Sequence, residues 1–380
     1  MRPLPTFLLL GLILGSTLEV HATARTGPEI PAANAFAPPT AVPDPPGRPE
    51  APDPPDDEAP PADTGPTRKN TLARYLPHVA GYLQLGGEVS ETTSTFFLKR
   101  ACLYLTGSFT PTLNYHFQFD FALPNIIDAY LSYRPLLQLG IKAGEFKVPF
   151  SIENTVYSPV KFEFIEYPLA LTRLMGLNDI CGLRSTGRDL GASLYGGFLR
   201  RGDRCLLSYE IGLFNGEGIN TRDRNRTKDL SAQLTLEPCA GLRLSASYYW
   251  GEYGPQYLRR VRYGAGICYD RYPVVVRSEW IGGETGLPSR DGARAGMLES
   301  RGWYAMGGWW VTRTWMPVVR CDTFLEDTSS RQTRQCNCTA GTVWQPIRHL
   351  RCQLNYTYEH HAARTSADRN VLSVMVSGIF

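Results

Sequence analysis

The end of the chain, residues 370–380, constrains the fold more than any other stretch. In an extended strand, one face would carry Leu372, Val374, Val376, Gly378 and Phe380. An alternating segment of about ten residues can cross a bilayer as a tilted β-strand, whereas a helix needs about twenty apolar residues. Because a single strand in hydrocarbon would leave its backbone groups unpaired, a membrane interpretation requires a closed barrel upstream. A soluble sandwich or a buried edge strand is the alternative for this stretch taken alone.

The N-terminal part is typical of an exported protein. Residues 1–24 are predicted to be a signal peptide, with Arg2 near the start, an apolar run from Phe7 to Leu14, and small residues at Ala22-Thr23-Ala24. Residues 25–70 are dense in Pro, Ala and acids, which predicts a disordered linker. We interpret the linker as a spacer, with a Pro-rich ligand as the alternative. Residues 71–380 remain for a barrel.

Charge is distributed unevenly along the chain. The formal net charge is +3. The predicted signal is neutral and the linker holds four basic and eight acidic residues, which leaves residues 71–380 with a charge of about +7. Only five of the basic residues in this body are Lys. An Arg-rich body is suited to bidentate recognition of carboxylate or phosphate.

Nine cysteines are scattered along the chain without any C-x-x-C pair. The odd number means that at least one thiol is unpaired or pairs between chains. Most of them lie in strand-like segments, where Cys acts as a small apolar residue. We therefore predict no metal site and no cofactor.

Alternating segments recur from residue 80 to the end, and we predict an all-β transmembrane antiparallel barrel of about sixteen strands. The predicted strands are 80–90, 95–108, 112–122, 126–134, 137–145, 188–200, 204–214, 228–237, 240–250, 258–271, 273–283, 302–312, 315–325, 334–345, 348–359 and 370–380.

The links between these segments alternate in length. Every second link is tight, as at Pro135, Tyr272-Pro273 and Pro346. The others include longer links, such as 215–227 and 284–301. Short periplasmic turns and long outer loops are expected of a bacterial barrel, whereas a soluble sandwich has no reason to alternate. The longest link, 146–187, is expected to fold into the lumen and narrow it, with a lid on the outer surface as the alternative.

The stretch from Gly144 to Glu153 reads GEFKVPFSIE, and it resembles the phosphate-selective porin O and P family. Residues 100–109, 118–122, 128–131, 188–191 and 212–218 resemble the family in the same order, so the similarity covers nearly all of residues 80–380. The resemblance implies a sixteen-stranded outer-membrane barrel, commonly a homotrimer, that conducts anions through a pore lined by Arg and Lys. The nine cysteines and the Pro-rich linker depart from the usual pattern of the family.

Strand parity identifies candidate pore-lining, anion-binding residues, because a lipid-facing Arg at mid-bilayer would cost about 2–4 kcal/mol. Lys147 is added because it follows the fifth predicted strand in the family-like stretch. The candidates are Arg100, Lys142, Lys147, Arg243, Arg260, Arg262, Arg277, Arg320 and Arg351. The alternative is that these cations merely pair with lumen acids, because Asp120, Asp128, Glu210, Glu279 and Asp322 share the same faces.

Other classes of function find little support in the sequence. It has no G-x-S-x-G elbow, phosphate-binding Gly loop or H-E-x-x-H pattern, and His360-His361 lacks an evident partner, so we expect no enzyme. The aromatic residues lie on apolar strand faces, which argues against nucleic-acid binding. We predict a porin of the bacterial outer membrane for small, mainly anionic solutes such as phosphate. The alternatives are a differently selective porin, and a plugged barrel that acts as an adhesin or scaffold.

Phe380 resembles the aromatic end that bacterial barrels present to their assembly machinery. We expect deletion of Phe380 to reduce the amount of folded barrel in the outer membrane while the conductance of each inserted barrel stays the same. Immunoblotting of membrane fractions together with single-channel recording measures both quantities. Wild-type membrane levels of the variant would contradict the idea.

Overall fold

A computed structural model describes residues 77–380 except 177, 203, 289–295 and 364–365. The predicted signal peptide and linker therefore lie outside the described residues. Within the described part, the chain forms sixteen strands and three short helical segments. The strands are β1 (His78–Val89), β2 (Ser94–Thr110), β3 (Leu113–Asp120), β4 (Asn125–Leu136), β5 (Leu139–Lys147), β6 (Arg188–Arg201), β7 (Arg204–Phe214), β8 (Asp229–Cys239), β9 (Leu242–Tyr253), β10 (Leu258–Arg271), β11 (Val274–Gly286), β12 (Met297–Trp309), β13 (Trp315–Leu325), β14 (Arg334–Ile347), β15 (Leu350–His361) and β16 (Arg369–Ile379).

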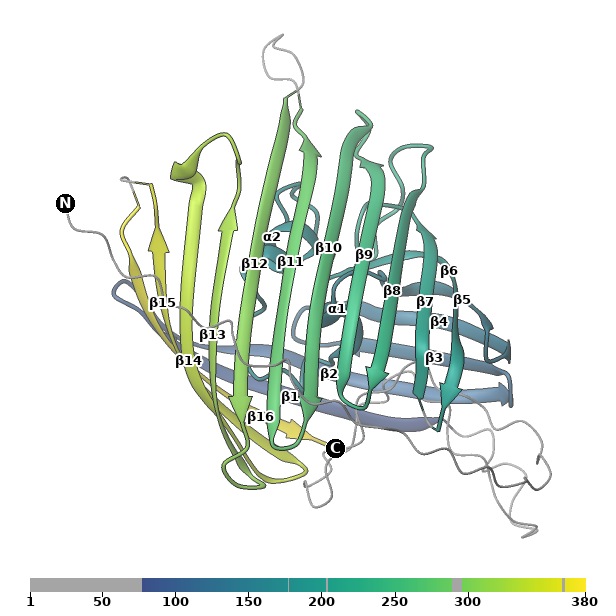
Figure 1. The fold of residues 1–380 in the computed structure, drawn as a ribbon, viewed down its shortest axis with the longest axis horizontal. Helices are drawn as coiled ribbons and strands as arrows, with labels where there is room; N and C mark the ends of the chain where they lie inside the picture. The colour runs from purple at the N-terminus through teal and green to yellow at the C-terminus, as the bar shows by residue number, and fades with distance from the viewer. Residues whose placement is uncertain (1–76, 177, 203, 289–295, 364–365) are drawn as a thin grey trace, which may run out of the picture. The chain divides into compact units, whose positions relative to one another are not determined.

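The strands form one closed barrel in which each strand pairs antiparallel with its neighbours in sequence (Figure 1). The barrel closes where β1 pairs with β16, from Tyr82 opposite Ile379 to Val89 opposite Leu372. The amide of Gly81 donates to the carbonyl oxygen of Phe380 at 2.8 Å, and the amide of Phe380 donates back at 2.9 Å. The closed sixteen-stranded barrel that the sequence predicts is confirmed.

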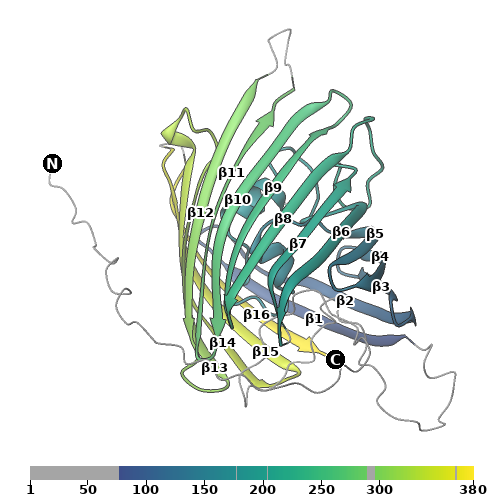
Figure 2. The same cartoon turned by 45° about the vertical axis from the view of Figure 1, so that its right-hand side comes forward.

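The two faces of the wall differ in the way that a bilayer requires. In β16, Leu372, Val374 and Val376 are about half exposed on the outside, whereas Ser373 and Ser377 are buried inside. Similar alternation runs along β9, with Trp250 outside and Arg243 inside. An apolar outer band suits lipid, and the inner face is left for polar side chains. The strands are tilted around the barrel, as the turned view shows (Figure 2).

Most strand boundaries agree with the prediction within a few residues, and β12 differs most. The prediction was 302–312, but the strand runs from Met297 to Trp309. Glu299 and Arg301 occupy outward-facing positions of this strand, where apolar residues were expected. Hydrophobic alternation therefore did not reveal the first five residues of β12. Backbone pairing with β11 nevertheless continues to Met297.

The links at one end of the barrel are tight, as at Tyr272-Pro273 and Arg348-His349, and the longest links gather at the other end. One of these longest links, 148–187, contains α1 (Ile152–Val156) and α2 (Leu169–Met175). Another contains the 3-10 helix η2 (Arg331–Thr333). None of the helices in the described residues is long and apolar enough to cross a membrane.

Candidate functional site

Residues 148–187, here called the inner segment, fold into the barrel between β5 and β6. The amide of Val148 donates to the carbonyl oxygen of Gly187 at 2.9 Å, so the two ends of the segment are tied together. Figure 1 shows α1 and α2 behind the near strands of the barrel wall. The inward fold that the sequence favoured is confirmed by contacts between this segment and lumen-facing side chains.

Glu279 of β11 fixes the start of the inner segment. Its carboxylate accepts hydrogen bonds from the Ser151 hydroxyl at 2.7 Å and from the Ile152 amide at 3.1 Å. Ser151 has a positive φ of 70°, which turns the chain sharply into α1. Ser231 of β8 holds the chain two residues earlier, because its hydroxyl donates to the Pro149 carbonyl oxygen at 3.0 Å. The family-like stretch of the sequence therefore forms the entry into the lumen.

Arg277 of β11 holds two acids of the inner segment at once. Its Nε lies 3.0 Å from Glu153 Oε1, and its terminal nitrogens bind the carboxylate of Glu163. The guanidinium also lies over the Tyr157 ring, 4.0 Å from the ring centroid. Burial alone would raise the pKa of Glu163, but the charge and hydrogen bonds of Arg277 lower it below its usual value. Charge-assisted pairing keeps this buried carboxylate ionised.

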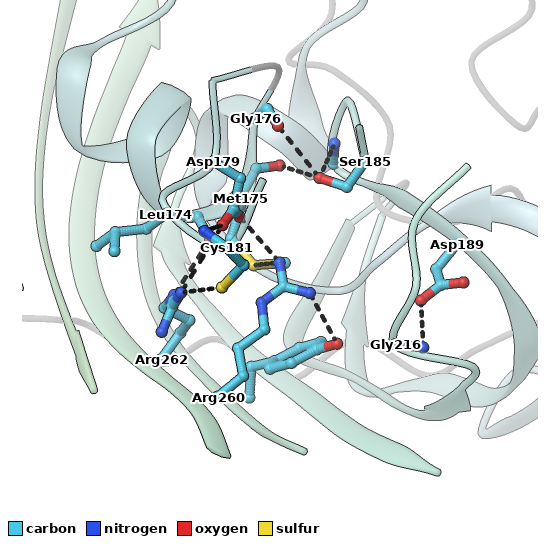
Figure 3. A network of polar contacts seen from close by, with 12 residues as sticks. Leu174, Met175, Gly176, Asp179, Cys181, Ser185, Asp189, Gly216, Arg260 and Arg262 are labelled. Carbon is cyan, nitrogen blue, oxygen red and sulfur yellow. Dashed lines mark hydrogen bonds and ion pairs between the residues drawn. The ribbon is translucent and has the colours of Figure 1, made fainter. Parts of the chain in front are cut away.

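Arg260 and Arg262 of β10 form a second anchoring network below the end of α2 (Figure 3). Arg260 binds Asp179 at 3.1 Å, and Arg262 donates from Nε to the Leu174 carbonyl oxygen at 3.1 Å. Arg262 also donates to Cys181 Sγ at 3.3 Å. Burial raises the pKa of Cys181 to about 11, so the thiol stays protonated at neutral pH. Both guanidiniums are almost completely buried.

Arg320 of β13 and Arg351 of β15 grip the backbone of the inner segment. Arg320 donates to the Glu166 carbonyl oxygen at 2.7 Å, and Arg351 donates to the Phe162 carbonyl oxygen at 2.9 Å. Next to Arg320, the Asp322 carboxylate accepts from the Leu169 amide at 2.8 Å. Guanidinium donors thereby satisfy backbone carbonyls that would otherwise be buried without partners.

Lys99 joins this group through a bulge that the sequence did not reveal. The register of β1 and β2 shifts between Gln84 and Leu85, so that Arg100 pairs with Gln84 but Leu98 pairs with Leu85. The extra residue, Lys99, reaches the Ile165 carbonyl oxygen at 2.6 Å and the carboxylate of Glu166. Strict alternation would have placed Lys99 and Arg100 on opposite faces of the wall, but the bulge lets the Lys99 side chain reach the inner segment as well.

Aromatic side chains support the inner segment from the opposite wall. Neighbouring rings follow one another at centroid distances of 4.5–7 Å, a range typical of aromatic pairs. The rings of this aromatic belt, one from each of β1 to β5 and one from β7, are Tyr82, Tyr104, His116, Tyr130, Phe146 and Phe214. Val160 packs against its first two members, and Phe150, Leu171 and Leu174 join the cluster of its last three. The inner segment is thus held by arginines on one side and by aromatic rings on the other.

The nine predicted pore residues fall into two groups. Arg260, Arg262, Arg277, Arg320 and Arg351 are brought together by the inner segment and are buried. The other four lie apart from this cluster. Lys147 donates to the Tyr157 carbonyl oxygen at the start of the inner segment, whereas Arg100 donates to Gln84, Lys142 pairs with Glu210, and Arg243 pairs with Glu237. Their predicted role in binding anions stays a prediction.

Sequence reasoning missed the acids of the inner segment that hold the arginines, Glu153, Glu163 and Asp179. No local spacing identifies them, because their partners lie about 80 to 125 positions away in the chain. The acids within the wall were anticipated, and Asp322 lies 3.4 Å from Arg320 as the pairing alternative proposed. Arg277 and Glu279, which share one face of β11 two residues apart, instead bind separate groups of the inner segment.

At the outer rim, His360 has a partner that the sequence did not reveal. Its Nδ1 lies 3.0 Å from Asp368, which also accepts a hydrogen bond from Tyr358 at 2.6 Å. Hydrogen bonds from Tyr358 and His360 lower the pKa of Asp368 to about 2. This exposed cluster braces the link between β15 and β16.

A closed barrel with an apolar outer band, a polar inner wall and an inward-folded segment defines the class of outer-membrane porins. The family model described as phosphate-selective porin O and P matches residues 82–266 and 256–378, so the chain belongs to that family. The protein is therefore a porin of the bacterial outer membrane, and family and fold indicate a channel rather than an enzyme. No curated protein sequence matches the chain significantly.

Solved porin structures share the fold at low sequence identity. An anion-selective porin from Comamonas acidovorans is 11% identical with a TM-score of 0.58, over 80% of this chain and 99% of that one. The outer membrane channel DcaP of Acinetobacter baumannii is 10% identical with a TM-score of 0.58, over 80% and 97%. The trimer form of OmpT, an outer membrane protein of Vibrio cholerae, is 10% identical with a TM-score of 0.57, over 80% and 99%.

We expect Arg277→Met to release the inner segment, because it leaves Glu153 and Glu163 buried without their guanidinium. Removing one partner of a buried ion pair costs about 3–5 kcal/mol. The free energy of unfolding should fall by that amount, and trypsin should cut the folded protein faster after Lys161 and Arg173. Urea unfolding and limited proteolysis in detergent measure the two effects.

The matched control is Arg259→Met, which removes an exposed guanidinium 3.1 Å from Glu284 at the rim of the same wall. Exposed pairs contribute about 0–1 kcal/mol, so this variant should behave like the wild type. Equal effects of the two substitutions would refute the anchoring role of Arg277.

Proposed function

We propose that this porin lets small hydrophilic solutes diffuse passively across the outer membrane, with a preference for anions and with phosphate as a candidate solute. The observation that carries the preference is Arg100, which is partly buried on the inner wall of β2. It donates to the neutral amide oxygen of Gln84 at 3.0 Å, so this partner leaves the positive charge in place. Fixed cations facing water within a low-dielectric wall attract anions.

Three further observations support the preference. Residues 71–380 carry a net charge of about +7, which comes mainly from arginine. The family is described as phosphate-selective, and one porin of similar fold is described as anion-selective. Lys147, at the end of β5, lies at the entry of the inner segment and is only partly buried. We assign to the inner segment the role of the constriction where such charges act on a passing solute.

A second candidate function is a plugged barrel that serves as an adhesin or as a scaffold for a partner. The observation that favours it is the burial around the inner segment, where Arg262 is 0% exposed and Arg277 is 1% exposed. The aromatic belt closes the opposite side with rings that are equally inaccessible. In this alternative the inner segment blocks the lumen instead of narrowing it.

We also propose a homotrimer embedded in outer-membrane lipid, and recognition of Phe380 by the barrel-assembly machinery. The trimer form of OmpT shares the fold, and the apolar outer face of this barrel can contact lipid or another subunit. Phe380 is 63% exposed next to the strand that closes the barrel.

Planar-bilayer recording tests the channel and its preference together. In a KCl gradient we expect stepwise currents with a reversal potential whose sign shows that chloride permeates better than potassium. Arg100→Gln should move the reversal potential toward zero, because it removes a cation from the inner wall and keeps hydrogen-bonding capacity. A parent protein that passes cations better would refute the anion preference.

A second variant separates a porin from a plugged barrel. Residues 158–180 are replaced by a Gly-Ser linker of equal length, which keeps the reach of the chain and removes its anchoring side chains. A constriction predicts current in the parent and a larger conductance in the variant. A plug predicts current in the variant alone.

For phosphate, we expect submillimolar phosphate to reduce the chloride current of the parent, and Lys147→Ala to weaken this block. Loss of the ammonium group removes an attractive charge at the entry of the constriction. The control is Lys228→Ala in the outer loop, where the ammonium group pairs with Asp223, and its block should equal that of the parent. Absence of block in the parent would rule out a phosphate-binding site.

A further inference from the structure

Two cysteines face each other on the lipid side of the barrel wall. Cys321 in the middle of β13 lies directly opposite Cys338 of β14 in the strand register. Their Sγ atoms are 3.4 Å apart, and both side chains are exposed on the outer face. Neither of these two thiols takes part in the contacts that hold the inner segment.

The strand pairing places these residues within reach of a covalent bond. Directly opposed residues of antiparallel strands have Cα atoms about 4.5–5.5 Å apart, and disulfides bridge Cα distances of about 4.4–6.8 Å. Only rotation of the side chains is needed to bring the sulfur atoms together. Cys336 is the competing thiol, but it lies opposite Thr323, with its Sγ 3.3 Å from the Thr323 hydroxyl.

The route to the outer membrane supplies the oxidising conditions. An outer-membrane protein crosses the periplasm, where disulfides form and persist. Cys321 and Cys338 are 17 positions apart and belong to one hairpin, so they meet as soon as β13 and β14 pair. We propose that Cys321 and Cys338 form a cross-strand disulfide on the membrane-facing surface.

The reaction is a thiol–disulfide exchange with an oxidised periplasmic protein that carries a reactive disulfide. The thiolate of one cysteine attacks that disulfide and forms a mixed disulfide, and the second thiolate then displaces the oxidant. The Cys321–Cys338 bond forms, the disulfide of the oxidant breaks, and the oxidant leaves as a dithiol that carries both electrons and the two protons of the cysteine thiols. Once lipid covers the bond, soluble thiols have little access to it.

The bond would lie directly behind contacts that hold the inner segment. Arg320 and Asp322, the neighbours of Cys321, face the lumen and bind the Glu166 carbonyl oxygen and the Leu169 amide. A register slip of one residue in this hairpin would turn both side chains toward lipid. The disulfide therefore covalently fixes the register on which this part of the anchor depends.

Mass spectrometry of the full protein tests the proposal. Outer membranes are denatured in SDS with N-ethylmaleimide and no reductant, and the protein is then digested with trypsin. We expect the peptide 321–331 to be linked to the peptide 335–348, and to separate from it after reduction. Recovery of Cys321 and Cys338 as alkylated thiols without reduction would overturn the proposal.

Two variants identify the partner within the second peptide, which contains both Cys336 and Cys338. Cys336→Ser should keep the link, and Cys338→Ser should lose it. A link that survives in Cys338→Ser and disappears in Cys336→Ser would assign the bond to Cys336 and refute the pairing. Because the main measurement is made on the wild type, poor folding of a variant does not remove the test.

Discussion

The structure depends first on the requirement that no backbone amide or carbonyl remain unpaired in hydrocarbon. Sixteen strands meet this requirement only because β1 and β16 pair along their length and because Gly81 and Phe380 exchange hydrogen bonds. Closure then determines the chemistry of the two faces. Each strand must present apolar groups to lipid, and polar and charged groups are left to the enclosed space. A segment that enters this space meets a wall already rich in arginine.

The arginines of β10, β11, β13 and β15 pair with acids and carbonyl groups of the inner segment. A buried guanidinium is costly without partners, and a buried backbone carbonyl is also costly, so each satisfies the other. Bidentate geometry suits arginine for this work better than lysine, which agrees with the small number of lysines in the body. Much of the positive charge that the composition shows is therefore used for structure. The proposed anion preference therefore rests on a smaller set of cations, with Arg100 and Lys147 as the candidates.

The sequence was sufficient for the strands, the closure and the side of the wall on which each arginine lies. These features follow from a period of two, which the residues of a regular strand obey locally. The lumen contact of Lys99 could not be predicted, because a single bulge breaks that period. The start of β12 could not be predicted either, because charged residues there lie on the outward face. The pairing of Glu153, Glu163 and Asp179 with arginines could not be predicted for another reason. Parity gives the face of a residue, but not its depth in the barrel or its partner in a distant segment.

The aromatic belt and the arginine anchors have a consequence for the order of folding. The inner segment contacts β1 and β2 through Val160, and it contacts β15 through a bond between residues 189 positions apart. Closing so long a loop costs conformational entropy, and no contact compensates for this cost until the partner strand is in place. Contacts of this kind therefore form late. Residues 148–187 are synthesised well before β15 but can dock only after β15 has joined the sheet. The inner segment is therefore among the last parts of the barrel to become fully ordered, because its contacts with β15 must wait for that strand.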